Sequence, residues 1–187
     1  MLDFLMSFDP IPLQTLIWLI PVAFFIHDGE EILLMEKWLR SHGNHSRIAF
    51  ENRLLDPGKS ITLQFTVAVL LLGSVLSLIT FLSVMRFEKN GQLSMLCAGV
   101  LAVILLDGIK HVVFSLLLRA YSAGVITAIL VEIPFASYAL YRFYDAGKIS
   151  LITLAGGLAL ALPLTILLVF CGLMLGKWII PYPKVRR

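Results

Sequence analysis

Long stretches without a charged side chain constrain this chain more than any other feature. No Asp, Glu, Lys or Arg lies between Lys59 and Arg86, or between Lys148 and Lys177. A transmembrane helix needs ~20 consecutive, mostly apolar residues, and both stretches meet that length. The sequence therefore predicts an all-α fold whose helices cross a membrane.

The overall composition leads to the same conclusion. Hydrophobic residues make up 59% of the 187 residues and charged residues 14%, whereas soluble domains are about one half apolar and about one quarter charged. A soluble fold of this size could not bury so much apolar surface, so we expect a single membrane domain over residues 1–187. The net charge of +3 is small, and no basic block alternates with aromatic residues, which argues against nucleic acid as a partner.

The apolar stretches predict a polytopic membrane helical bundle of about five transmembrane helices. Their expected bounds are 12–40, 59–85, 92–118, 125–144 and 150–179. With this topology, ten Lys and Arg residues lie on one side of the membrane and four on the side of the N-terminus. Because Lys and Arg concentrate on the cytoplasmic side, we expect the N-terminus outside and the C-terminus inside. A bacterial inner (cytoplasmic) membrane is the expected location.

Eight ionisable side chains interrupt these apolar helices. They are His27, Asp28, Glu30, Glu31, Asp107, Lys110, His111 and Glu132, with Gln64 as a neutral candidate beside them. An ionised side chain at the centre of a bilayer costs ~2.5–3.5 kcal/mol on insertion scales. We therefore expect these side chains to face one another across a single interior cavity.

Helical geometry groups the polar residues of the first helix. At ~100° per residue, His27, Glu30 and Glu31 share one face, while Asp28 points to the side and is the weaker candidate. This segment ends the first apolar run, which places it toward the predicted cytoplasmic side.

Three polar residues of later helices agree with that depth. Asp107 and His111 are four residues apart and therefore stack on one face of the third helix. Glu132 lies in the first half of the fourth helix, which begins on the same side. The sequence thus predicts one site shared by several helices.

The acids in this set outnumber the bases. Five carboxyl groups against one lysine leave a net charge of −4 when the histidines are neutral, and a low-dielectric interior tolerates this only if protons or a metal neutralise it. Histidine and carboxylate at helical spacing are ligands for one zinc, or for a pair of iron, manganese or zinc ions. The candidate ligands of a divalent metal are His27, Glu30, Glu31, Asp107, His111 and Glu132. The alternative is a hydrogen-bonded polar core that fixes helix packing.

Small residues gather on the last predicted helix. Gly172 and Gly176 form a Gly-x-x-x-Gly pair, and small residues let membrane helices approach closely. The pair predicts either close packing inside the bundle or a homo-oligomer formed through this helix.

The chain resembles the HXXEE-domain family of integral membrane proteins. The segment from His27 to Glu31 carries the motif, and Asp107-Gly-Ile-Lys-His111 is similar to the Asn-x-x-x-His motif of that family. Tyr121-Ser-Ala-Gly124 is similar to the Tyr-x-Pro-Gly-like turn that follows it. Two positions depart from the pattern: Asp107 keeps an oxygen ligand and adds charge, and an alanine at position 123 relaxes the turn. The resemblance covers about residues 14–175 and points to His27, Glu30, Glu31 and His111.

The favoured function is a membrane-embedded metal-dependent hydrolase. Its substrate would be a membrane lipid or another hydrophobic small molecule, reached from the cytoplasmic leaflet. Glu30 or Glu132 would act as general base and then acid, and Lys110 would stabilise a developing oxyanion or a phosphate. The metal and its water would be held by His27, Glu31, Asp107 and His111.

Three other functions remain open at this stage. One is a di-iron-type membrane oxygenase, and another is a metal-free hydrolase that uses a Glu–His pair. The third is a proton- or ion-coupled transporter with a buried acid and histidine relay. Five helices are few for a carrier, and the sequence shows no inverted repeat.

Overall fold

The described residues form a helical bundle without strands. A computed structural model describes residues 11–42 and 54–182. Its long helices are α2 (Leu13–His42), α4 (Ile61–Asn90), α5 (Met95–Leu118), α7 (Ile133–Asp145) and α8 (Leu151–Ile179). A short α6 (Val125–Thr127) and a π-helical turn, η2 (Ala128–Glu132), lead without interruption into α7. The described chain therefore contains five long helical rods, which confirms the predicted all-α fold.

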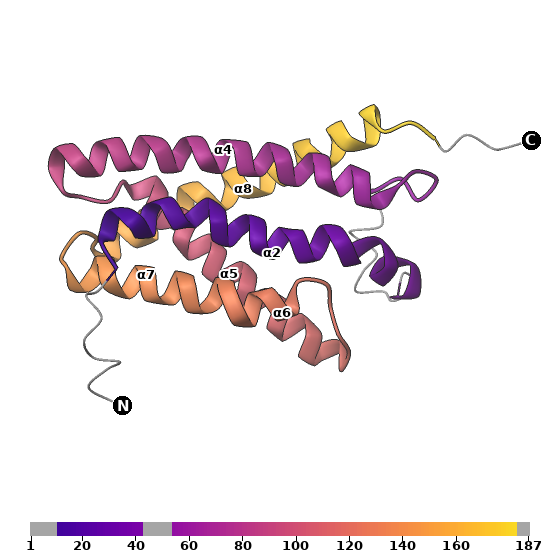
Figure 1. Cartoon of the computed structure of the whole chain (residues 1–187), viewed down its shortest axis with the longest axis horizontal. Helices are drawn as coiled ribbons and strands as arrows, with labels where there is room; N and C mark the ends of the chain where they lie inside the picture. Colours follow the sequence, from indigo (N-terminus) through magenta and orange to yellow (C-terminus); the bar gives the residue numbers. More distant parts are fainter. Residues whose placement is uncertain (1–10, 43–53, 183–187) are drawn as a thin grey trace, which may run out of the picture.

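The helices lie alongside one another in Figure 1, with α8 passing behind α4. Four rods are long and apolar enough to cross a membrane, namely Ile61–Asn90, Met95–Leu118, Val125–Asp145 and Leu151–Ile179. The helix α2 is equally long at 30 residues, but charged residues interrupt its apolar run from position 28 onward. The chain is a membrane protein, and its orientation across the bilayer stays a prediction.

Serine caps explain why three helices begin slightly later than the apolar runs suggest. The side chains of Ser60, Ser94 and Ser150 each accept a hydrogen bond from the backbone N–H three residues further on. Such caps satisfy N–H groups that have no partner within the helix. The second helix also runs five residues beyond its predicted end at 85, and Gly91, with φ of 64°, stops it. Most of the predicted loop 41–58 lies outside the described residues.

An unusual turn starts the fourth rod. In η2 the backbone N–H of Ile133 bonds to the carbonyl of Ala128, five residues earlier, instead of four. Pro134 follows directly, and it has no N–H to offer to the preceding turn. The extra residue in this turn sets the direction in which Glu132 projects.

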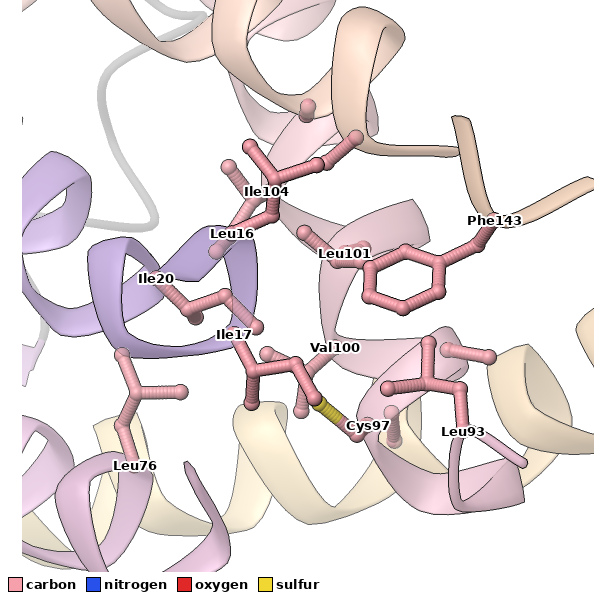
Figure 2. Packing of buried hydrophobic residues seen from close by; sticks show 14 of the residues in the cluster. Leu16, Ile17, Ile20, Leu76, Leu93, Cys97, Val100, Leu101, Ile104 and Phe143 are labelled. Carbon is pink, nitrogen blue, oxygen red and sulfur yellow. The ribbon is translucent and has the colours of Figure 1, made fainter. Parts of the chain in front are cut away.

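An apolar core holds α2 against α5 and α7. Figure 2 shows Ile17 and Ile20 of α2 close to Leu101 of α5, with Phe143 of α7 packed at the side. Cys97 is a free thiol inside this core, as expected for a cysteine that acts as a small hydrophobic residue. The core fixes the first half of α2, and the polar segment follows it along the helix.

The predicted Gly-x-x-x-Gly pair packs inside the bundle. A Cβ on Gly172 would lie 2.6 Å from the Cα of Ala68, and one on Gly176 would lie 2.5 Å from the carbonyl oxygen of Gln64. These glycines let the backbones of α8 and α4 touch. A homo-oligomer formed through other residues of α8 stays a prediction.

A second close approach leads to a stability prediction. A Cβ on Gly99 of α5 would lie 2.0 Å from the carbonyl oxygen of Gly157 of α8. Gly99→Val should therefore separate the two helices and cost at least the ~1–3 kcal/mol typical of overpacking. Thermal unfolding in detergent measures the loss. Gly29→Ala is the matched control, because no atom lies within 4 Å of its added Cβ, and an unchanged midpoint for Gly99→Val would contradict the packing.

Candidate functional site

The polar segment lies near the middle of α2. The segment ends the apolar run, and the helix continues through Glu36 to His42, close to the predicted bounds of 12–40. His27 and Glu31 are both buried, and they face α5 and the turn η2. The segment therefore lies inside the bundle.

Two histidines and three acids converge at this point. His111 Nε2 lies 3.1 Å from Asp107 Oδ2 and 3.2 Å from Glu31 Oε1. His27 Nε2 lies 3.6 Å from Asp107 Oδ2 and 3.6 Å from Glu132 Oε2. The two imidazole rings meet edge to face with their centroids 4.7 Å apart. Five of the six predicted metal ligands thus lie together, drawn from α2, α5 and η2.

Glu30 is the predicted ligand that the structure places elsewhere. One of its oxygens, Oε2, accepts hydrogen bonds from the backbone N–H of Thr127 at 2.8 Å and from its hydroxyl at 2.6 Å. The other accepts from the hydroxyl of Tyr121. Burial and then the hydrogen bond to Glu30 raise the pKa of Tyr121, so this phenol stays protonated and donates. Glu30 ties α2 to the chain between α5 and η2, and its carboxylate is not directed at the histidines.

Thr127 is the residue that the sequence reasoning missed. Its Oγ1 donates to Glu30 and lies 3.0 Å from His27 Nδ1. The hydroxyl, which also lies 3.3 Å from the carbonyl oxygen of Gly124, thus links the carboxylate of Glu30 to the imidazole of His27. On the other side of this ring, Nε2 faces Asp107 and Glu132. The sequence feature that could have indicated Thr127 is its hydroxyl within an apolar run, six residues after Tyr121.

The converging atoms have little hydrogen bonding of their own. Within the described part of the chain, His27 Nε2, His111 Nε2 and Glu132 Oε2 are buried without a hydrogen-bond partner. Buried polar atoms of this kind call for an explanation. One ligand atom each from His27, Asp107 and His111 lies within 4.8 Å of the others, and ligands held ~2.1 Å from one tetrahedral ion would be ~3.4 Å apart. The donor set therefore fits a divalent metal, with Glu31 and Glu132 beside it.

Gly124 makes room for this arrangement. Its φ of 88° favours glycine, and an added Cβ would lie 2.9 Å from His27 Cε1 and 3.0 Å from His111 Cε1. It would also lie 3.1 Å from Glu31 Cγ. The turn between α5 and α6 therefore closes one side of the histidine pair, and both its conformation and its contacts require glycine.

A cavity of about 320 Å³ lies next to the acids. Its polar wall is lined by Asp28, Glu31, Asp107, Lys110 and Glu132, and the rest by apolar side chains and Thr165. The angle argument set Asp28 aside, but the residue is buried and faces the cavity. Two faces of α2 therefore point into the protein, one toward the histidines and one toward the cavity.

Two further candidates differ in their outcome. Lys110 lines the cavity and donates to Asp107 Oδ1 at 2.7 Å, so it lies beside the cluster. Gln64 is fully buried but bonds to the backbone of Asp56 and Ser60 at the start of α4. It therefore organises a helix terminus and does not join the acids.

The comparisons with known proteins give one result. No curated protein and no solved structure matches the chain. A family model described as a protein of unknown function with HXXEE motif matches residues 18–139. This range is shorter than the expected 14–175, but it contains every residue of the converging cluster from His27 to Glu132. The match spans more than half of the sequence, and the chain therefore belongs to the HXXEE family.

Proposed function

We propose that the chain is a membrane-embedded, metal-dependent hydrolase that acts on a lipid or another hydrophobic substrate. One observation carries the proposal: the Nε2 atoms of His27 and His111 converge on a carboxylate oxygen of Asp107, next to a largely apolar cavity, and neither nitrogen has a hydrogen-bond partner among the described residues. A merely structural polar core would be expected to satisfy these atoms, because unpaired buried polar groups are costly.

In this proposal His27, Asp107 and His111 hold the metal. Glu31, beside the histidine pair, is a further ligand of the same ion. When bound, a divalent ion such as zinc supplies Lewis acidity and makes water nucleophilic at neutral pH. Thr127 and Glu30 keep Nε2 of His27 turned inward. Such outer-shell partners orient metal-binding histidines in many proteins.

Glu132 is the proposed general base. Its Oε2 lies 3.6 Å from His27 Nε2 and has no hydrogen-bond partner among the described residues, while the residue also lines the cavity. A carboxylate there can take a proton from the attacking water and return it to the leaving group. Lys110 lies at the same wall, where its ammonium can stabilise a developing oxyanion. Glu30, the other candidate base, has a positioning role instead.

The cluster also supports a second candidate, a proton relay. Glu31, His111, Asp107, His27 and Glu132 form a continuous path with steps of 3.1–3.6 Å. Acid and histidine chains of this kind carry protons in membrane transporters. A di-iron-type oxygenase would use the same ligands with two ions and an electron donor.

Elemental analysis of the purified full-length protein, combined with hydrolysis of a long-chain ester, tests the proposal. We expect stoichiometric divalent metal, ester hydrolysis that stops after chelation, and recovery when zinc or manganese is added. Hydrolysis that survives complete metal removal would support the metal-free Glu–His mechanism and contradict ours. A metal-free protein that moves protons across liposome membranes would instead be a carrier, and oxygen consumption with a reductant would indicate an oxygenase.

Thr127→Val gives a prediction for the outer shell. Valine keeps the size but removes the hydroxyl that links Glu30 to His27 Nδ1, so the orientation of the imidazole is lost. We expect metal affinity to fall ~10–100-fold, the usual effect of an outer-shell partner. Titration against a chromophoric chelator measures it. Thr66→Val is the matched control, because among the described residues the hydroxyl of Thr66 bonds only its own helix, at Thr62. Equal affinity in the two variants would remove Thr127 from the site.

A further inference from the structure

The cavity beside the acids has charged groups on one part of its wall and almost entirely apolar side chains on the rest. The helix α4 contributes only apolar side chains to the lining, and α8 adds a single hydroxyl, that of Thr165. All the charged lining groups come from α2, α5 and η2. A ligand that fits such walls has a long apolar part and one compact polar end.

The size of the cavity limits the apolar part. Its volume of about 320 Å³ is at the lower end of the ~300–1,000 Å³ range of small-molecule sites. Such a volume suits one hydrocarbon chain better than the two chains of a diacyl lipid. The lining extends from Ile79, just past the middle of α4, to Leu39 near the end of α2, so an extended chain lies along the helices.

The half-buried lining residues indicate the route by which a chain enters. Leu72 and Val75 lie near the middle of α4, and Leu164 and Leu168 near the middle of α8. All four line the cavity and keep part of their surface exposed. In a bilayer the middle of a spanning helix faces hydrocarbon, so the ligand enters from the lipid phase.

The charges at the polar end restrict the head group. Four carboxyl groups, those of Asp28, Glu31, Asp107 and Glu132, face the cavity with one ammonium, that of Lys110. Fully ionised, they carry a net charge of −3, and one divalent ion reduces this to −1. While these acids are ionised, the end stays negative with or without the ion, and it therefore does not attract a phosphate or a carboxylate.

We propose that this cavity binds a single hydrocarbon chain with an uncharged polar head, such as a long-chain alcohol or its ester. The head lies against Asp28, Glu31 and Glu132, where a hydroxyl can donate to a carboxylate. The inference rests on the proposed function for what happens to the head, while binding itself requires neither metal nor turnover.

Photolabelling of the full chain in nanodiscs tests the proposal. The probes are a diazirine-bearing long-chain alcohol and the fatty acid and alkyl phosphate of equal chain length. We expect the alcohol to label the cavity-lining segments of α4 and α8 at least ten times more than either anion. Equal labelling by the three probes, or labelling confined to other segments, would overturn the inference.

Two variants of α5 separate the cavity from the rest of the surface. Val103 lines the cavity and Val113 is exposed on the same helix, so Val103→Trp should abolish alcohol labelling while Val113→Trp leaves it unchanged. Leu168→Phe fills the cavity from α8 if Val103→Trp does not fold. Both filling variants should keep the metal content of the wild type. If the alcohol labels the cavity of a protein that binds no metal, the proposed hydrolase is contradicted and this inference stands. If the protein binds metal and hydrolyses the ester but its cavity is not labelled, this inference is contradicted and the proposed hydrolase stands.

Discussion

Glu132→Gln protein should bind metal as the wild type does and turn over substrate ~10²–10⁴ times more slowly, the range that general acid–base catalysis contributes. Glutamine has the size and shape of glutamate but accepts no proton at neutral pH. The side chain is buried in η2, with Oε2 3.6 Å from His27 Nε2, so the change removes the base with little effect on packing. Steady-state hydrolysis of a long-chain ester gives kcat and KM separately, and the loss should lie in kcat.

The matched control for this variant is Glu88→Gln. Glu88 is exposed near the end of α4 and accepts a hydrogen bond from Gln14, far along the chain from the cluster. The Glu88→Gln protein should have the metal content and the turnover of the wild type. Glu132→Gln protein with wild-type kcat would remove Glu132 from the reaction, and one that lost its metal would make Glu132 a ligand.

His111→Ala and His27→Ala should each lose bound metal from the purified protein. Each change deletes one of the two Nε2 atoms that converge on Asp107, and the remaining protein ligands hold the ion less tightly. The decrease in affinity should exceed the ~10–100-fold effect of outer-shell changes such as Thr127→Val. Elemental analysis after gel filtration measures the stoichiometry, with circular dichroism to verify the helices.

His42→Ala controls for the loss of a histidine as such. His42 is the last residue of α2, well separated along the helix from the motif, and its replacement should leave the stoichiometry intact. Metal retained in both His111→Ala and His27→Ala would contradict the ligand assignment. Metal lost in one variant alone would show that the two imidazoles do not share an ion.

The sequence could predict the helices because their cause is local. Runs such as 61–85 have no charged residue, and a run of that length has few alternatives to a membrane helix. The ends were less predictable, because they depend on single groups such as the Ser94 cap and the left-handed Gly91. These groups act through backbone hydrogen bonds and backbone conformation, which the apolar pattern of a sequence does not reveal.

Much of the cluster was also predictable. His27 and Glu31 lie on one face of a helix, Asp107 and His111 are one turn apart, and burial of charge requires them to meet. The angles on a helical wheel predict which residues of a helix lie on the same face. They do not predict which other part of the protein covers that face.

That limit explains two departures. Glu30 shares the His27 face, yet the hydroxyls of Tyr121 and Thr127 reach its carboxylate first. Asp28 points away from His27, yet a cavity covers that side as well. Tertiary packing decides which residues cover a helix face, and this packing could not be predicted from the single sequence.

The π turn η2 makes the position of Glu132 depend on one residue. Removing a residue between Ala128 and Ile133 would restore ordinary α-helical bonding and turn everything on one side of it by ~100° relative to the other. Such turns recur at functional sites. A single-codon insertion into a plain membrane helix would have been enough to swing a carboxylate into the histidine pair, so the site has an evolutionary route that needs no new segment of chain.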